Sequence, residues 1–176
     1  MGTIQITTTL YPMGLLMLEA ELQKMMSLTT AQIGRCGELL VQLELLKRGI
    51  ESAAVTTDTG IDLVAYLPEQ SKAITIQVKT NLKAKPGGGK SRLCLDWWIP
   101  SACPADFVAL SELDSNRIWL FTKSELKECA QQSPEGRFHF FMYTEQGLPR
   151  RDDKLHHDHE FNEYLLEQAV HRLIKM

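Results

Sequence analysis

Residues 61–80 read IDLVAYLPEQSKAITIQVKT, and this stretch decides the fold. Two apolar runs, residues 61–67 and 72–80, flank the turn-forming residues 68–71. In the second run Ile74, Ile76 and Val78 occupy every other position, which is typical of a β-strand with one buried face. We therefore predict an antiparallel hairpin of two central strands.

The short turn sets the register of this hairpin. If Leu67 faces Lys72 across the turn, Asp62 lies opposite Gln77. Directly opposite residues share a face, with Cβ atoms about 4.5–5.5 Å apart. Lys79 shares that face because it lies two residues beyond Gln77. Carboxylate and amide oxygens suit a hard cation such as Mg²⁺, and a nearby ammonium can stabilise phosphate charge. The alternative for these residues is a solvated polar face.

A long helix precedes the hairpin and is predicted over residues 30–48. Its apolar side chains recur at helical spacing, and Gly49 is positioned to end it. Gly34 and Gly37 inside the helix each cost about 1 kcal/mol relative to alanine. Such glycines are typical of a close backbone approach to a sheet or ligand. Glu38 is then expected near the face that carries Asp62.

The remaining pattern predicts a single α/β domain with additions at both ends. Residues 1–28 form an arm with a short helix, residues 29–145 form the core, and residues 146–176 form a charged connector and a last helix packed on the same domain. Within the core we expect a loop over residues 81–90 and a short helix over residues 124–130. The last helix is expected over residues 159–175. Further strands are expected over residues 53–57, 92–99, 107–110, 117–121 and 137–144.

The charge distribution points to a local patch rather than to a basic protein. The 176 residues include 19 Lys and Arg against 22 Asp and Glu, a net charge of −3. Overall charge therefore gives no attraction to nucleic acid. Residues 72–92, however, contain no acidic residue and six basic ones: Lys72, Lys79, Lys83, Lys85, Lys90 and Arg92. This segment has the polarity expected for contact with a phosphate backbone, and a solvated lysine loop is the alternative.

The cysteines, histidines and tryptophans indicate structural roles or a partner surface rather than catalysis. The four cysteines form no CxxC pair and are expected to be free thiols, mostly buried. The cluster of His156, His157, Asp158 and His159 lacks helical zinc spacing and is expected to be a solvated connector. If residues 92–99 form a strand, one of the neighbouring residues Trp97 and Trp98 faces away from the core and could stack on a base or a partner.

Cellular location follows from two absences in the sequence. The apolar runs are too short for a membrane-spanning helix. The start of the chain lacks the basic region of a signal peptide. We therefore expect a cytoplasmic protein with no membrane partner.

The order of these residues resembles the PD-(D/E)xK nuclease superfamily. The matching segments are Gly34-Arg35-Cys36-Gly37-Glu38, Gly60-Ile61-Asp62-Leu63-Val64-Ala65 and Ile76-Gln77-Val78-Lys79. Residues 105–121 also resemble the later strands of small members, such as homing endonucleases and resolvases. The resemblance implies a restriction-endonuclease-like α/β core, in which helices flank a mixed central β-sheet.

The same resemblance implies a Mg²⁺-dependent DNA endonuclease, with Mn²⁺ as a substitute. Asp62 would be the main metal ligand, with the Gln77 side-chain oxygen and the Val78 carbonyl as further ligands. Lys79 would position or activate water, and Glu38 would bind a metal directly or through water. Lys83, Lys85, Lys90 and Arg92 are the expected DNA contacts. Gln77 departs from the usual Glu or Asp, although some homing endonucleases and transposon-end nucleases have Gln there.

Two other functions stay open on the sequence. One is a catalytically inactive nucleic-acid-binding or assembly protein with the same fold. The other is an interaction protein that uses its methionine-rich N-terminal helix and its C-terminal helix. Cutting both strands of a duplex usually needs two sites, so a homodimer is one option for the nuclease.

Overall fold

The two central strands form in the predicted register. In the computed structural model, β2 (Leu63–Tyr66) and β3 (Ala73–Asn81) are antiparallel, with Leu63 opposite Ile76. The structure describes residues 27–57, 59–67, 73–87, 92–145, 147 and 153–174. The arm and helix expected before residue 27, the turn at residues 68–71 and Lys90 lie outside the described residues. Residues 31–176 form one compact unit, separate from the preceding residues.

β2 and β3 lie inside a five-stranded mixed sheet of order β1-β2-β3-β6-β7. The other strands are β1 (Glu51–Ala54), β6 (Phe107–Glu112) and β7 (Arg117–Thr122). β3 and β6 are parallel, and the remaining pairs are antiparallel. The strands expected over residues 107–110 and 117–121 are confirmed as β6 and β7, which form an antiparallel pair. The predicted mixed central sheet is confirmed.

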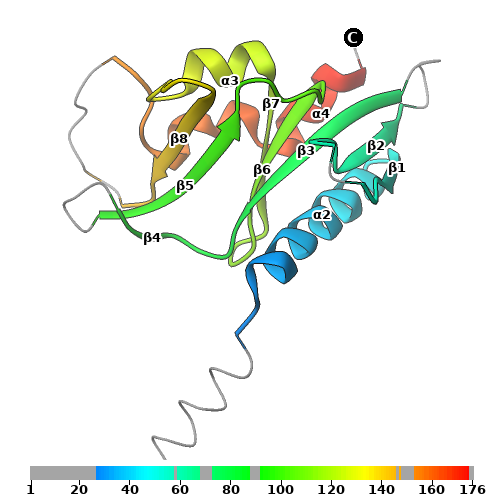
Figure 1. Ribbon diagram of the computed structural model, residues 1–176, viewed down its shortest axis with the longest axis horizontal. Coiled ribbons are helices and arrows are strands. Elements are labelled where there is room, and N and C mark those ends of the chain that lie inside the picture. Colours follow the sequence, from blue (N-terminus) through cyan, green and yellow to red (C-terminus); the bar gives the residue numbers. More distant parts are fainter. Residues whose placement is uncertain are drawn as a thin grey trace, which may run out of the picture. The chain divides into compact units, whose positions relative to one another are not determined.

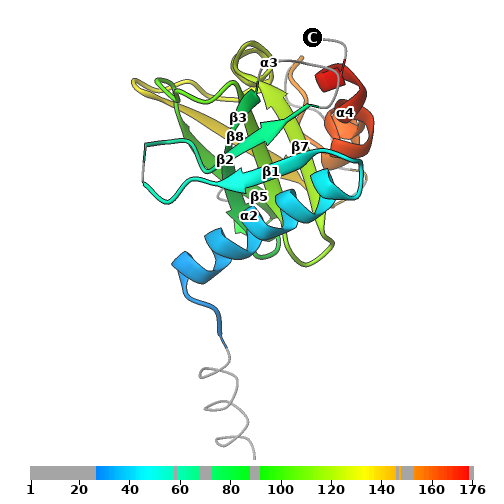
Figure 2. The same cartoon turned by 90° about the vertical axis from the view of Figure 1, so that its right-hand side faces the viewer.

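Helices cover one face of this sheet. α2 (Thr30–Leu46) runs along it, and α4 (Leu166–Ile174) lies beside β7 (Figures 1 and 2). After α2, Gly49 adopts φ +75° and donates its N–H to the Leu46 carbonyl, so the predicted glycine stop is confirmed. The core on this face contains Val41, Leu45, Ile76, Val78, Phe107, Ala109, Leu166, Ala169, Val170 and Leu173.

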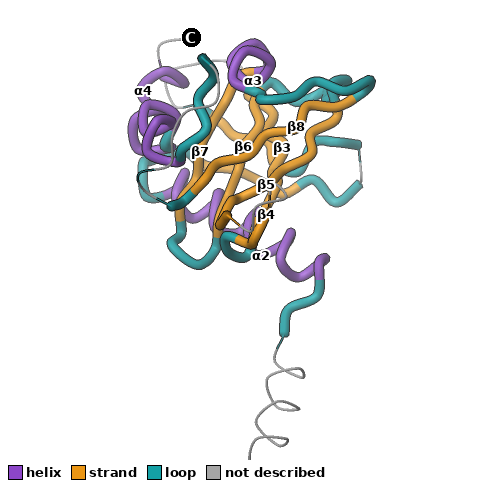
Figure 3. The backbone as a smooth tube through the Cα atoms, turned by 90° about the vertical axis from the view of Figure 1, so that its left-hand side faces the viewer, coloured by secondary structure: helices purple, strands orange, loops and turns teal. Residues whose placement is uncertain are grey.

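A second sheet covers the opposite face (Figure 3). It consists of β4 (Lys85–Gly87), β5 (Arg92–Pro100) and β8 (Arg137–Tyr143), all antiparallel. α3 (Lys123–Cys129) follows β7 and begins with a capping box between Thr122 and Glu125. The core between the two sheets contains Leu95, Trp97, Ile99, Val108, Leu110, Trp119, Phe121, Phe140 and Met142.

The structure corrects two predicted elements. The expected loop over residues 81–90 contains β4, which pairs with β5. The expected last helix is broken into the 3₁₀ helix η1 (Asp158–Tyr164) and α4. The break falls at Leu165, which adopts φ −54° and ψ 139° and forms an antiparallel bridge with Trp119 of β7. Pairing with the sheet therefore overrides the local helical pattern.

The histidine cluster is also corrected. His156 and His157 are buried, because they pack beside Phe141 and Tyr143, and Tyr143 forms a parallel bridge with His157. The connector is therefore not a solvated segment at these positions.

The cysteines agree with the sequence prediction. All four are free thiols. Burial raises the pKa of the Cys94 and Cys129 thiols, which disfavours the thiolate form. In the described ranges no helix has both the length and the apolar character needed to cross a membrane.

Candidate active site

Asp62 lies at the entrance to β2, with its carboxylate held against β3. Its backbone N–H donates to the Ile76 carbonyl at 3.0 Å, which continues the β2–β3 pairing by one residue. Its Oδ2 accepts a hydrogen bond from the Val78 N–H at 2.6 Å. A main-chain donor of the central strand therefore fixes the position of this carboxylate beside the next predicted site residue, Gln77.

Gln77 projects from β3 on the face opposite α2. Its neighbours Ile76 and Val78 belong to the helix-side core, and side chains alternate along a strand. Gln77 is only 4% exposed, and its Oε1 is buried with no hydrogen-bond partner. A buried polar atom without a partner costs about 1–3 kcal/mol. This amide oxygen is therefore an acceptor held ready for a ligand.

Gly60 lies close to both Pro104 and the Gln77 amide. Gly60 has φ +78°, and a Cβ there would lie 3.0 Å from Pro104 Cδ and 3.6 Å from Gln77 Nε2. A glycine is therefore favoured here for two reasons: it adopts the left-handed backbone readily, and it has no Cβ to crowd the Gln77 amide. Pro104, which lies between β5 and β6, has no local sequence signal that would have placed it here.

β3 contributes two further groups to the candidate site, the Lys79 side chain and the Val78 carbonyl. Lys79 shares the face of Gln77 and is partly exposed. The N–H and C=O of one strand residue point to the same side, so the Val78 carbonyl points toward the side where its N–H meets Asp62. β2 begins only at Leu63, so this carbonyl faces the place where the β2–β3 ladder has ended.

Glu38 lies on α2, which packs on the face of β3 opposite Gln77 and Lys79, and not on the face where the sequence analysis expected it. α2 packs closely on β3 and β6 at Gly37, where a Cβ would lie 1.9 Å from Thr80 Oγ1 and 2.7 Å from Ser111 Oγ. Glu38 follows at the next position and accepts a hydrogen bond from Arg35 at 2.6 Å. The predicted close approach of helix and sheet is confirmed at Gly37, whereas Gly34 has open space around it.

Comparison with known proteins shows the fold. No family model matches this chain, and no curated protein matches it. Among solved structures, a bacterial homing endonuclease, I-Ssp6803I, superposes with a TM-score of 0.53 at 14% identity, over 84% of this chain and 94% of that chain. This chain has the fold of that enzyme. The mixed α/β architecture predicted from the sequence is thereby confirmed.

Two further structures are similar at lower scores. The Holliday junction resolvase Hjc of Archaeoglobus fulgidus matches with a TM-score of 0.41 at 16% identity, over 62% of this chain and 83% of that chain. MepB matches with a TM-score of 0.33 at 14% identity, over 65% of this chain and 85% of that chain.

The donor set on β2 and β3 fits a hard cation. Asp62 supplies a carboxylate, Gln77 a buried amide oxygen and Val78 a main-chain carbonyl. These are oxygen ligands, which Mg²⁺ and Mn²⁺ prefer over sulfur or imidazole. No group of three or more His, Cys, Asp or Glu side chains within the described ranges could hold a metal, so a zinc-type cluster is not part of this region.

The basic residues lie on two consecutive elements near the end of β3. Lys83 and Lys85 are exposed, at the start of the β3–β4 connection and on β4. Arg92 begins β5 and is half-buried, with its guanidinium 5.7 Å from the centre of the Tyr143 ring. The structure therefore brings Lys85 and Arg92 onto paired strands, which the sequence did not predict.

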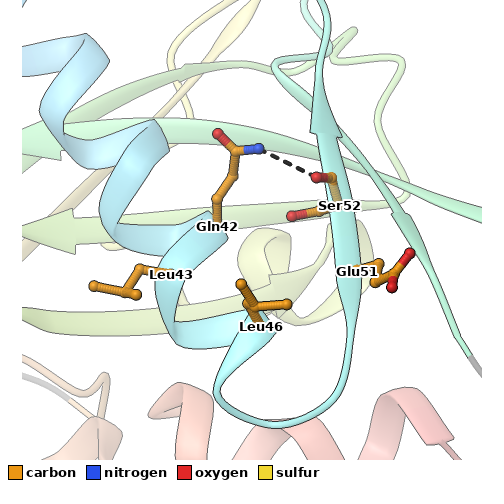
Figure 4. Close-up of a pocket in the computed structure, with 5 residues that line it drawn as sticks. All are labelled: Gln42, Leu43, Leu46, Glu51 and Ser52. Carbon is orange, nitrogen blue, oxygen red and sulfur yellow. Dashed lines mark hydrogen bonds between the residues drawn. The ribbon is translucent and has the colours of Figure 1, made fainter.

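A separate hollow lies between α2 and β1 (Figure 4). Its lining consists of Gln42, Leu43, Leu46, Glu51 and Ser52, so it contains a single carboxylate. Gln42 Nε2 donates to the Ser52 carbonyl at 3.3 Å and thereby occupies an acceptor of the edge strand β1. This hollow is apolar at one side and lacks the mixed charges of the Asp62 region.

Proposed function

We propose that this protein is a metal-dependent DNA endonuclease of the PD-(D/E)xK type. The observation that carries the proposal is the buried, unpartnered Oε1 of Gln77 beside the oriented Asp62 carboxylate. Asp62, Gln77 and the Val78 carbonyl would hold Mg²⁺ or Mn²⁺. A cation bound by such ligands supplies Lewis-acid stabilisation to a phosphodiester.

The chain's own residues have distinct roles in this proposal. The Val78 N–H fixes the orientation of the Asp62 carboxylate, and Gly60, which has no side chain, leaves room for the Gln77 amide. Lys79 places a positive charge on the same face, where it stabilises negative charge on the phosphate or orients the attacking water. In hydrolysis, the water oxygen bonds to phosphorus as the bond to the leaving sugar oxygen breaks, and that oxygen takes up a proton.

The proposal is tested by incubating supercoiled plasmid with the protein and Mg²⁺. We expect conversion to nicked or linear DNA, with none in EDTA. A nucleic-acid-binding or assembly protein without activity is the second candidate, favoured by glutamine at position 77 instead of a carboxylate. It would retard DNA in a gel shift without cutting it in either Mg²⁺ or Mn²⁺.

Position 77 offers a test of metal binding alone. Gln77→Glu adds a carboxylate to the ligand set, so we expect tighter Mn²⁺ binding with nicking retained or raised at limiting metal. Gln77→Leu keeps the approximate size and removes the oxygen, so affinity should fall. Isothermal titration of the wild type, Gln77→Glu and Gln77→Leu with Mn²⁺ ranks their metal affinities. Equal affinities would show that this side chain does not touch the metal.

The basic segment offers a test of DNA binding. Replacing Lys83, Lys85 and Lys90 with alanine should weaken duplex affinity and flatten its dependence on salt. Each lost phosphate contact lowers the slope of log affinity against log salt by about 0.9. Fluorescence anisotropy with a labelled duplex in EDTA, at several salt concentrations, measures the slope. The same slope in the triple variant and the wild type would remove these lysines from the DNA contact.

A further inference from the structure

The outer face of the three-stranded sheet carries a row of aromatic side chains. Leu95, Trp97 and Ile99 of β5 point into the core, so the alternate residues point outward. Trp98 lies opposite His139, and Asp96 lies opposite Phe141. Directly opposite residues of an antiparallel pair share a face. Trp98 is therefore the tryptophan that faces away from the core.

Trp98 is held in one orientation. Its ring stacks on the His139 ring, with centroids 4.1 Å apart and planes 6° apart. His139 is fixed in turn, with Nε2 3.0 Å from Asp96 Oδ1 and Nδ1 3.2 Å from Gln132 Oε1. Trp98 is nonetheless 47% exposed. One side of the indole is thus backed by a fixed ring while a large part of it stays open, which lowers the entropic cost of stacking a ligand.

Along β8 the row passes from the open Trp98 end to a covered end, where Tyr143 is buried beside His156 and His157. Phe141 lies 5.4 Å from both the His139 and Tyr143 rings, and Arg92 lies over Tyr143. Arg137, two residues before His139, is exposed on the same face, as is Lys85 opposite Cys94.

Three basic side chains, Lys85, Arg92 and Arg137, lie on this face and complement a phosphate backbone. Two nearby carboxylates are held by hydrogen bonds, Asp96 to His139 and Glu145 to the Leu93 N–H at 3.0 Å, and Glu135 in the turn before β8 is exposed.

We propose that this face binds single-stranded DNA, with one base stacked on Trp98 and the phosphates near Arg137, Lys85 and Arg92. Aromatic platforms between cations suit single strands because every base has a face to stack, whereas duplex bases are already stacked. The inference rests on the proposed function in that it names the kind of DNA, unpaired nucleotides, that the nuclease would contact outside its metal site.

The test measures affinity by the fluorescence anisotropy of a labelled oligothymidylate in EDTA, where no cutting occurs, because this readout does not depend on Trp98; tryptophan quenching is followed in the wild type alone. Trp97 and Trp119 are 3% and 0% exposed, so quenching by the oligonucleotide reports on Trp98. We expect quenching in the wild type and a loss of affinity of roughly 5- to 100-fold in Trp98→Ala. Trp98→Phe keeps a stacking ring and should retain most of the affinity. Tyr66→Ala is the matched control, because Tyr66 is an aromatic residue of similar exposure, 53%, on the other sheet.

Unchanged affinity in Trp98→Ala, or an equal loss in Tyr66→Ala, would overturn the inference. The buried tryptophans report folding, so a Trp98→Ala protein with their native emission gives a valid comparison. Failure here is separable from failure of the proposed function. Mg²⁺-dependent nicking with no Trp98 effect removes only the single-strand face. Oligonucleotide binding that depends on Trp98 in a protein without nicking removes only the nuclease.

Discussion

Asp62→Ala should reduce Mg²⁺-dependent nicking by more than about 100-fold, because even the outer-shell partners of metal ligands are typically worth 10–100-fold. Asp62 supplies a carboxylate at the start of β2, and its Oδ2 is oriented by the Val78 N–H, next to Gln77 in the chain. Plasmid nicking with purified protein measures the loss. Mn²⁺ titration should show a parallel loss of metal affinity.

The same substitution removes a hydrogen bond, so a control must separate stability from catalysis. Asp106 provides it, since its Oδ2 accepts the Thr75 N–H at 2.8 Å, a contact of the same kind with the other end of β3. Asp106→Ala loses this bond and a second one from Thr75 Oγ1 at 2.7 Å, away from Gln77 and Lys79. Each hydrogen bond to a charged group is worth about 1.5–3 kcal/mol, so this control is destabilised at least as much by lost hydrogen bonds. It should keep its nicking activity below its unfolding temperature. Equal activity in the Asp62→Ala protein and the wild type would refute the assigned site.

Gly37→Ala should destabilise the fold, although alanine is the better helix former. Helix propensity favours alanine by about 1 kcal/mol. At Gly37, however, a Cβ would lie 1.9 Å from Thr80 Oγ1 and 2.7 Å from Thr80 Cγ2. Thr80 Oγ1 is also engaged by Ser111 Oγ at 3.0 Å, so its side chain cannot rotate away without losing that bond. Overpacking typically costs about 1–3 kcal/mol, and α2 must shift from β3 to relieve it.

Gly34→Ala is the matched control one turn earlier in α2. No heavy atom lies within 4 Å of a Cβ built there, so only the propensity term applies. The free energy of unfolding should rise by about 0.5–1 kcal/mol in this variant. Urea unfolding of both variants, followed by circular dichroism, shows whether the free energy of unfolding falls in Gly37→Ala and rises in Gly34→Ala. A gain of stability in both would mean that the helix–sheet contact at Gly37 is not as close as the structure shows.

The burial of α4 bears on the alternative of an interaction protein. Leu166, Ala169, Val170 and Leu173 all lie in the helix-side core. The apolar face of this helix is therefore used within the fold and is not available to a partner. The same alternative also uses the methionine-rich N-terminal helix, which lies outside the described residues.

The central hairpin was predictable from residues 61–80 alone. Period-two alternation defines which face of a strand is buried, and a short turn allows few registers. Together they place Asp62 beside Gln77 before any long-range contact is known. The end of α2 was predictable for a similar reason, since Gly49 adopts a left-handed backbone that other residues disfavour.

Contacts between distant residues decided the rest. Sequence patterns do not distinguish Gly34 from Gly37, because only the packing of α2 on Thr80 and Ser111 makes one of them indispensable. Leu165 fits a helical pattern but pairs with Trp119, 46 positions earlier in the chain, and breaks the helix. The close approach of Gly60 to the Gln77 amide and to Pro104 likewise joins residues far apart in the sequence. Local periodicity determines which way side chains point, whereas burial depends on what packs against them from elsewhere in the chain.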